Sequence, residues 1–316
     1  MTNLLKAEVN RWFSRRLWWA MLLGAVALAA LVLVGMAAGY SPQTPAQIAQ
    51  AERDYADAVK QAEQDRQDCL DDGQPAEDCE AWVPERADFV QVPPTYPMLV
   101  EIGAQTATLI SELAALLVAA SFMGAEFKSG SLATWLTYVP RRVPVFVSKA
   151  LVAGGGSALL GVIVQAIVQA GVLLLGWLWL GPGGLHGAGA EWTVVGRGIV
   201  ATIAAGLIGL CLATLFGSTI APVAALLGAV VVQWVAGLIT LLIGAAPWMI
   251  RLLPDNNLNA FVSGHFETSY YEIGPSGAEI ERQVEIGLGQ ASLYLGCLLV
   301  AAVASALWSF TRREVR

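Results

Sequence analysis

Long apolar runs recur along the chain and are separated by polar segments of very different length. A helix that crosses a membrane needs about 20 mostly apolar residues. Six runs meet this length and are predicted to be spans: residues 17–38, 99–122, 145–180, 194–216, 220–245 and 286–310. The pattern therefore predicts an all-α integral membrane protein with about six transmembrane helices.

Residues 1–16 form a separate amphipathic segment ahead of the first predicted span. On a helix, Leu5, Val9, Trp12 and Phe13 share one side, and Lys6, Asn10, Arg11 and Arg15 lie on others. A helix of this kind lies against the membrane surface. The sequence Ser14-Arg15-Arg16 also resembles the start of an export signal, but the apolar run is long for a cleaved signal and more spans follow it. We therefore predict an interfacial elbow helix that leads into a retained first span.

The polar segment between the first two predicted spans, residues 39–98, is large enough for a small external domain. Residues 46–72 are rich in Ala, Gln, Glu, Asp and Arg. A weak apolar stripe at helical spacing runs through Ala49, Tyr55, Val59 and Ala62. The part that follows is rich in proline. We predict a mainly helical, acidic domain with an irregular second half.

Cys69 and Cys79 are the two cysteines outside the predicted spans. Outside the membrane, a close pair in a loose segment that contains proline favours a disulfide. The alternative is two free thiols. A metal site is disfavoured, because no further Cys or His lies nearby in the sequence. Cys211 and Cys297 lie in apolar runs, where cysteine behaves as a small buried hydrophobic residue.

A second external segment, residues 246–285, separates the last two predicted spans. It is polar, aromatic and acidic, but it begins with the apolar run Trp248-Met249-Ile250 between Pro247 and Pro254. Such a start can return into the membrane as short re-entrant helices, provided that the broken backbone faces protein or water. The last span is followed by a short, mainly basic tail, residues 311–316.

Four polar side chains inside the predicted spans are candidates for a substrate path. Glu112 lies roughly 20 Å from Glu126 at 1.5 Å per residue, near the middle of a core about 30 Å thick. A carboxylate there must face protein or water, or be protonated, so it is either a transport site or a structural hydrogen-bonding group. Gln165 and Gln169 share a helix face and either line the path or pair with another helix. Gln233 lies in the middle of a span.

The composition agrees with a polytopic membrane protein, since hydrophobic residues make up 56% of the chain. The net charge of −7 conceals an uneven distribution. If both termini are cytoplasmic, most basic residues lie in short inner segments, where the positive-inside rule places them. These residues are Lys6, Arg11, Arg15, Arg16, Lys128, Arg141, Arg142, Lys149, Arg312, Arg313 and Arg316.

The sequence contains no motif for chemistry within the chain. There is no G-x-x-x-x-G-K-[ST] phosphate loop, and the glycines at 154–156 lie in an apolar run without a Lys. No H-E-x-x-H or G-x-S-x-G motif occurs, and the chain has 2 His. No segment combines basic and aromatic residues in the way that nucleic-acid binding requires. We therefore expect no enzymatic activity, no metal and no nucleic-acid partner for this chain.

Residues 123–144 interrupt the apolar pattern between the second and third predicted spans. Ser131 can cap a short helix through its side-chain oxygen. Leu132, Trp135 and Leu136 form the apolar side of that helix, and Pro140 ends it. The basic residues Arg141, Arg142 and Lys149 follow. The residues alone leave two interpretations open. The segment is an ordinary inner loop, or it is a docking element for a cytoplasmic partner.

The N-terminal helix, the six spans and the motif after the second span together resemble the membrane permease subunit of bacterial ABC type-2 exporters. In that family a Glu, a Gly-Ser pair, a Leu, a Pro-x-Arg pair and a Lys recur at similar spacing. The matching residues here are Glu126, Gly130, Ser131, Leu132, Pro140, Arg141, Arg142 and Lys149. Residues 252–260, LLPDNNLNA, resemble the family's external segment with re-entrant helices. The acidic external domain departs from minimal members of the family, so the resemblance does not indicate which substrate this chain would export.

The resemblance implies a half-transporter in the bacterial plasma membrane, in contact with lipid. Two permease subunits, identical or different, would pack together, and two cytoplasmic ABC ATPase subunits that bind ATP and Mg would dock below them. This chain itself would hold no cofactor. The residues expected to couple to the ATPase are Glu126, Ser129, Gly130, Leu132, Trp135, Leu136, Pro140, Arg141 and Arg142. Of these, Glu126, Arg141 and Arg142 would anchor the docking loop electrostatically.

Two functions of other classes also fit the pattern. An ion-coupled secondary transporter would use Glu112 as its proton site, although the two halves of the chain show no convincing inverted repeat. A membrane sensor or scaffold would bind a ligand through its external domain.

Overall fold

The computed structural model describes residues 2–73, 75, 79, 83–91, 94–138, 141–243, 247–273 and 279–312. Within these ranges, six helices are long and apolar enough to cross a membrane. They are α2 (Arg16–Gly39), α4 (Tyr96–Ser129), α6 (Arg142–Leu180), α7 (Trp192–Phe216), α8 (Ile220–Ile243) and α11 (Leu288–Arg312). The prediction of an all-α membrane protein with six spans is confirmed.

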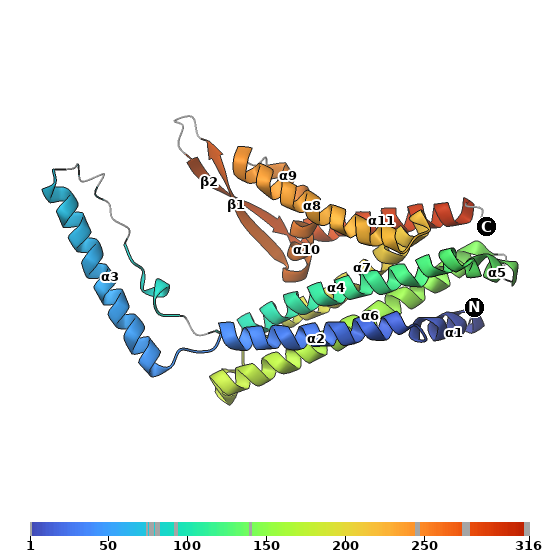
Figure 1. The fold of residues 1–316 in the computed structure, drawn as a ribbon, viewed down its shortest axis with the longest axis horizontal. Helices are drawn as coiled ribbons and strands as arrows, with labels where there is room; N and C mark the ends of the chain where they lie inside the picture. Colours follow the sequence, from blue (N-terminus) through green and yellow to red (C-terminus); the bar gives the residue numbers. More distant parts are fainter. Residues whose placement is uncertain are drawn as a thin grey trace.

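The spans run between two distinct ends of an elongated molecule (Figure 1). At one end, both ends of the chain lie close to α1 (Thr2–Phe13) and the short helix α5 (Ser131–Tyr138). We call this the α5 end. At the opposite end stands the external helix α3 (Pro45–Asp71), and we call this the α3 end.

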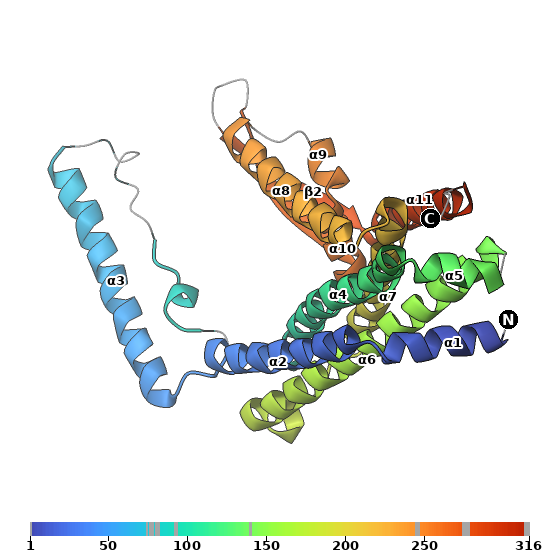
Figure 2. The ribbon, with the colours of Figure 1, turned by 45° about the vertical axis from the view of Figure 1, so that its right-hand side comes forward.

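Helix α4 forms the centre of the bundle. In the most apolar stretch of α4, 72% of the residues are buried, whereas 11–17% are buried in the corresponding stretches of α2, α8 and α11. Helix α7 packs so closely on α4 that a Cβ added at Gly209 would lie 2.4 Å from the carbonyl oxygen of Leu116. Figure 2 shows α8 lying apart from α2 and α6. Three of the six spans therefore present most of their apolar surface outward.

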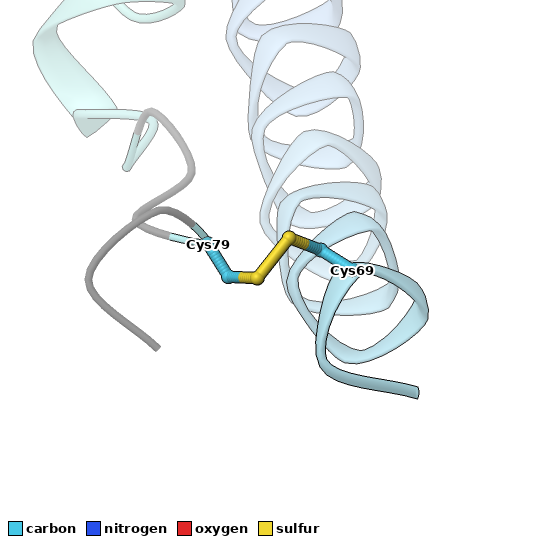
Figure 3. Close-up of a disulfide and its surroundings, with 2 residues drawn as sticks. All are labelled: Cys69 and Cys79. Carbon is cyan, nitrogen blue, oxygen red and sulfur yellow. A yellow bond between two sulfur atoms is a disulfide. The ribbon is translucent and has the colours of Figure 1, made fainter. Parts of the chain in front are cut away.

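The external domain is mainly helical, as predicted. Thr44 and Gln47 form a capping box at the start of α3, and Pro45 occupies the first helical position. The chain that returns from α3 is held along it by the Cys69–Cys79 disulfide (Figure 3). An ion pair between Arg86 and Glu52 holds it further along the helix. The apolar stripe of α3 has a partner in this returning chain, because the rings of Tyr55 and Phe89 lie 5.9 Å apart.

Between α8 and α11 lie two short helices and a β-hairpin. Helices α9 (Pro247–Leu252) and α10 (Pro254–Ser263) are separated by a break at Leu253, in agreement with the short helices expected around Pro247 and Pro254. Strands β1 (His265–Ile273) and β2 (Glu279–Gly287) pair in antiparallel register, with Phe266 opposite Ile286 and Thr268 opposite Val284. The sequence analysis did not predict this hairpin. Alternating apolar positions in β2 were the available signal, since Val284 and Ile286 are buried and the residues between and beside them are not.

The helices also differ in extent from the predicted spans. Helix α4 continues to Ser129, so residues 123–129 of the predicted coupling segment are its last turns. Gly130 then ends the helix in the left-handed conformation, with φ of 69°, which glycine adopts without steric penalty. Helix α6 begins at Arg142 rather than at residue 145, and α11 begins at Leu288 because β2 occupies residues 279–287.

Candidate functional site

Helix α5 connects the two most buried long helices, α4 and α6, at the α5 end of the bundle. The reversal at Gly130 lets α5 begin directly at Ser131. Ser131 was expected to cap the helix from the residue before it, but it is instead the first residue of the helix. The Oγ atom of Ser129 accepts a hydrogen bond from the backbone N–H of Ser131, at 3.4 Å.

The two faces of α5 have opposite character. Leu132 is completely buried, in an apolar cluster that includes Trp12, Phe122 and Phe146. Trp135 is partly buried against the same cluster. Leu132, which was expected to couple to the ATPase, is covered by the protein's own core and is not part of the surface that α5 presents. Among the α5 side chains that the structure describes, the exposed ones are Ser131, Thr134, Thr137 and Tyr138, and Tyr138 is 81% exposed.

Five charged side chains meet beneath α5 and form what we call the charge cluster: Glu8 and Arg11 from α1, Arg15 from the link to α2, Glu126 from α4, and Lys149 from α6. The Nζ atom of Lys149 lies 2.9 Å from Oε2 of Glu8 and 2.7 Å from Oε2 of Glu126. The Lys149 and Glu8 side chains are fully buried. The other carboxylate oxygens are approached by arginine: Arg11 lies 3.6 Å from Glu8, and Arg15 lies 3.6 Å from Glu126.

Aromatic rings cover the charge cluster on the side of the core. The ring of Phe122 lies 4.7 Å from the Lys149 ammonium and 5.1 Å from the Arg15 guanidinium, so its face is available to two cations. Trp12 packs edge-on against Phe122 at 5.0 Å. This arrangement requires glycine at position 156, since a Cβ there would lie 2.4 Å from the Trp12 indole.

The charge cluster joins four elements that are far apart in the sequence. Lys149 connects α6 to α1 and α4 at once, and the Arg11 guanidinium stacks 4.1 Å from the ring of Trp135 on α5. Burial lowers the pKa of Arg15, and the carboxylates of Glu126 and Glu8 oppose that shift. Helix α5 is therefore connected to α1 by a stacked ring and, through the ion pairs of the charge cluster, to α4 and α6.

The structure places the predicted electrostatic anchors differently from the expectation. Glu126 is buried and pairs within the chain, so it is not free to anchor a partner. The Nη1 atom of Arg142 donates to the carbonyl oxygens of Phe310, at 3.1 Å, and Thr311, at 3.3 Å, where it satisfies the C-terminal end of α11. Arg141 is exposed. The Leu136 side chain and Pro140 lie outside the described residues.

The glutamines of α6 pair with α4, which is one of the two alternatives that the sequence left open. Gln165 donates from Nε2 to the carbonyl oxygen of Ala104 and to Oγ1 of Thr108, both at 3.0 Å. Gln169 donates to the carbonyl oxygen of Val100 at 3.2 Å. Both side chains are buried, so they connect two helices rather than line an open path. Gln233 is half-buried on α8.

Glu112 has no such partner. The residue is 7% exposed, and its Oε1 atom has no hydrogen-bond partner among the described residues. Of the four polar candidates in the spans, it is the one that carries a carboxylate, and it lies on the most buried helix. Of the alternatives that the sequence left open, the structure shows the side chain facing protein, and the described ion pairs supply it no counter-charge.

The disulfide predicted between Cys69 and Cys79 is present and closes a short loop beyond the end of α3 (Figure 3). Cys211 is buried, as expected, whereas Cys297 is exposed on the outward side of α11. Across the part of the chain that the structure describes, no group of three or more His, Cys, Asp and Glu side chains is placed to hold a metal ion.

Sequence reasoning missed Glu8 as a member of the charge cluster. The available signal was its isolation, because Glu8 is the one acidic residue among residues 1–16 and shares a helix face with Arg11, Trp12 and Arg15. It also missed Asn256 and Asn257, whose roles depend on the break between α9 and α10. Comparison of the sequence with protein-family models and with curated proteins found no match.

Proposed function

We propose that this chain is the membrane-spanning permease subunit of an ATP-driven exporter, and that α5 is the element on which a separate ATPase subunit docks. One observation carries the proposal. A short helix between two spans turns a polar face with Thr134 and Tyr138 outward, while its inner face is embedded in the core and tied to the charge cluster. A loop that only connects two spans does not require contacts with α1, α4 and α6, whereas an element that couples an ATPase to the spans does.

The distribution of charge supports a cytoplasmic position for the α5 end and for both termini. Short polar segments at this end are basic, and the positive-inside rule applies to segments of this length. The basic residues described there are Lys6, Arg11, Arg15, Arg16, Lys128, Arg141, Arg142, Lys149 and Arg312. The opposite end carries the acidic external domain and its disulfide, and disulfides persist in oxidising surroundings outside the cytoplasm.

The outward apolar surfaces of α2, α8 and α11 support the second part of the proposal, a pair of permease subunits in the membrane. Their apolar windows are 11–17% buried within one chain. Lipid can cover such surfaces, and so can a second permease subunit. In the proposed exporter, closure of two ATPases would press on two copies of α5 and change the packing between the subunits.

The test uses the outward face of α5, because a substitution of Leu132 would damage the core. Thr134→Asp with Tyr138→Asp should abolish co-purification of a nucleotide-binding subunit from the native source and its stimulated ATP hydrolysis. Asn10→Asp, on the exposed surface of α1 at the same end, is the matched control and should leave both intact. Circular dichroism and thermal melting should be unchanged for both variants. If the wild-type chain never co-purifies with a subunit that carries a phosphate-binding loop, the proposal fails.

A second candidate function is supported by Glu112, whose buried carboxylate has no described partner. An intramembrane carboxylate of this kind can serve as the proton site of an ion-coupled secondary transporter. Vesicles separate the two functions. Uptake driven by a proton gradient without ATP, and lost in Glu112→Gln, would select the secondary transporter over the ATP-driven exporter.

A further inference from the structure

The break between α9 and α10 packs against α11 but keeps an open surface, since Leu252 is 54% exposed and Arg251 and Asp255 are exposed. The Tyr294 hydroxyl donates to the carbonyl oxygen of Leu252, at 2.8 Å, and Gln290 donates to that of Arg251. Tyr294 is six residues into α11, which starts at the α3 end, so the break lies about 9 Å along that span. The two short helices therefore form a re-entrant pair.

Two buried asparagines make this break tolerable. Asn256 donates to the carbonyl oxygen of Ile250, at 2.9 Å, and Asn257 donates to those of Arg251 and Leu253, at 2.8 and 2.9 Å. The carbonyls of Ile250 and Leu253 also accept backbone hydrogen bonds, from Leu253 at 3.4 Å and Asn257 at 3.2 Å, so the asparagine side chains supply further partners where α9 ends. A broken helix inside a membrane is stable only when its free backbone groups are satisfied in this way. The position of the α10 N-terminus is consequently well defined.

Helix α10 returns toward the α3 end along α4. Its last residue, Ser263, accepts a hydrogen bond from Gln105 of α4 at 2.8 Å, and Val262 packs against Ala104 and Ala201. Asp255, eight residues before Ser263, is about 12 Å deeper along α10, and Glu112 is about 10 Å deeper than Gln105 along α4. The two carboxylates are therefore at about the same depth, and they interact electrostatically.

Arg251 of α9 is four positions before Asp255 in the sequence but belongs to none of the described ion pairs, and the other basic residues on the helices around this pair lie elsewhere. On α6 they are Arg142 and Lys149, which are engaged at the α5 end. Arg197 of α7 lies beside Gly264, beyond the end of α10 that is remote from Asp255. The described residues of α8 and α10 include no Lys or Arg. Glu112 and Asp255 thus have no partner in the described ion pairs, and Oε1 of Glu112 is buried with no hydrogen bond.

We infer that Glu112 and Asp255 form the binding site for a cationic group on the cargo, and that the cargo is an apolar organic cation. This inference rests on the proposed function as an exporter. Glu112 is buried among apolar neighbours, whereas Asp255 is exposed and accepts a hydrogen bond from Asn259 at 3.5 Å, so the pair is open to a ligand on one side. Two carboxylates outside the described ion pairs attract a positive charge, and a ligand that brings its own apolar surface to Glu112 avoids the desolvation that a small ion would suffer there.

A bare metal ion fits the site less well. Calcium takes six to eight oxygen ligands. The hydroxyls nearest to Glu112 on α4 are already engaged, since Thr108 donates to the carbonyl oxygen of Ala104 and Ser111 bonds Thr202 at 2.7 Å. The flanking positions on the same helix are apolar, with Leu109, Ala115 and Leu116 within one turn of Glu112. The pair therefore offers charge without a coordination cage, which suits a large cation.

The test measures binding of tetraphenylphosphonium to the purified full chain in detergent by equilibrium dialysis against empty micelles. Tetraphenylborate, an anion of the same shape, is the ligand control. Glu112→Gln and Asp255→Asn should each weaken tetraphenylphosphonium binding at least about tenfold. Glu281→Gln, which removes a carboxylate from the exposed hairpin, should leave it unchanged. Tetraphenylborate should bind more weakly than the cation to the wild-type chain and should not respond to the two variants in the same direction.

Glu112→Asp keeps the charge and should retain binding within about threefold, which separates loss of charge from misfolding. Equal affinity of wild type and Glu112→Gln, or equal affinity for the cation and the anion, overturns the inference. The measurement needs no ATPase. If the chain binds the cation but no ATPase co-purifies with it, the cation site is supported and the exporter function is rejected. If an ATPase docks on α5 but the chain does not bind the cation, the exporter function is supported and the cation site is rejected.

Discussion

Two glutamates on the same helix, Glu126 and Glu112, are buried to nearly the same extent, at 5% and 7% exposure, and have opposite surroundings. Glu126 meets Lys149 at 2.7 Å and Arg15 at 3.6 Å. Glu112 has no described ion pair, and the charge that acts on it is that of another acid, Asp255. Burial by itself therefore does not say what a carboxylate does in this protein.

The difference lies in which elements surround each carboxylate. At the α5 end, the elbow helix α1 brings Arg11 to the cluster beneath α5, and the link after it brings Arg15. In the middle of the bundle, α4 is surrounded by the apolar central parts of other spans and by α10, whose first turn is acidic. The carboxylates of the first region have cationic partners, which the proposed coupling role uses. Glu112 has none in the described ion pairs, and the proposed cation site rests on this difference.

The largest expected effect on this comparison comes from Lys149→Met. Removal of the one ammonium shared by Glu8 and Glu126 leaves two buried carboxylates, each with a single partly exposed arginine at 3.6 Å. Breaking a buried ion pair by removing one partner costs about 3–5 kcal/mol. We expect a loss of this size in the free energy of unfolding, measured by titration of the purified chain in mixed micelles with a denaturing detergent.

Two further variants control the Lys149 measurement. Lys60→Met removes one partner of an exposed pair with Asp57, whose side chains are 73% and 77% exposed, and should change stability by about 0–1 kcal/mol. Addition of Glu126→Gln to Lys149→Met should recover part of the loss. A double variant less stable than Lys149→Met alone would show that the charge cluster is not the reason.

The second effect concerns the region around Glu112, where the backbone rather than charge supplies the stability. Asn257→Ala removes two side-chain hydrogen bonds, to the carbonyls of Arg251 and Leu253, which keep the bonds from Gln290 and from the backbone N–H of residue 257. Each hydrogen bond contributes about 0.5–1.5 kcal/mol, so the loss in the free energy of unfolding should be about 1–3 kcal/mol. Hydrogen exchange should become faster in α9 and α10 and stay unchanged in α1. Asn259→Ala, at an exposed position of the same helix, is the control.

A smaller effect is expected from Arg11→Gln. Its guanidinium stacks on Trp135 and pairs with Glu8, but its side chain is 37% exposed, so solvent screens both interactions. The loss should be about 1 kcal/mol, within the range of partly exposed cation–π contacts. Tryptophan fluorescence should report a more mobile Trp135. Lys6→Gln, an exposed position on the same helix, should leave both stability and fluorescence as in the wild type.

The smallest expected effect is the most informative. Glu112→Gln should leave stability unchanged or slightly raised, because it removes a buried charge that has no described partner. The same substitution at Glu126 should lower stability by about 2 kcal/mol or more, because it leaves Lys149 with one carboxylate. Parallel thermal melts compare the two. If both variants lose stability equally, the contrast between the two regions is wrong.

The sequence predicted features that depend on neighbouring residues. The spans follow from apolar length, α5 follows from its amphipathic spacing, and the disulfide follows from two cysteines ten positions apart outside the membrane. The break near Pro254 follows from the ring of proline, which removes a helical hydrogen bond. Hydrophobic length and proline act where they stand, so no knowledge of the fold was needed.

Only the tertiary structure decided which polar groups meet. Glu8 and Lys149 are separated by 141 positions in sequence, and no local pattern indicates that Lys149 Nζ donates a hydrogen bond to Glu8 Oε2 at 2.9 Å. The outward face of α5, the pairing of Gln165 with α4 and the depth of Asp255 beside Glu112 depend in the same way on how helices pack. Burial of apolar surface can be satisfied by many arrangements of six spans, whereas a buried charge is stable only where a distant residue supplies its partner. The sequence therefore determined that this chain enters a membrane, and the packing determined where its charges are compensated and where one is left open.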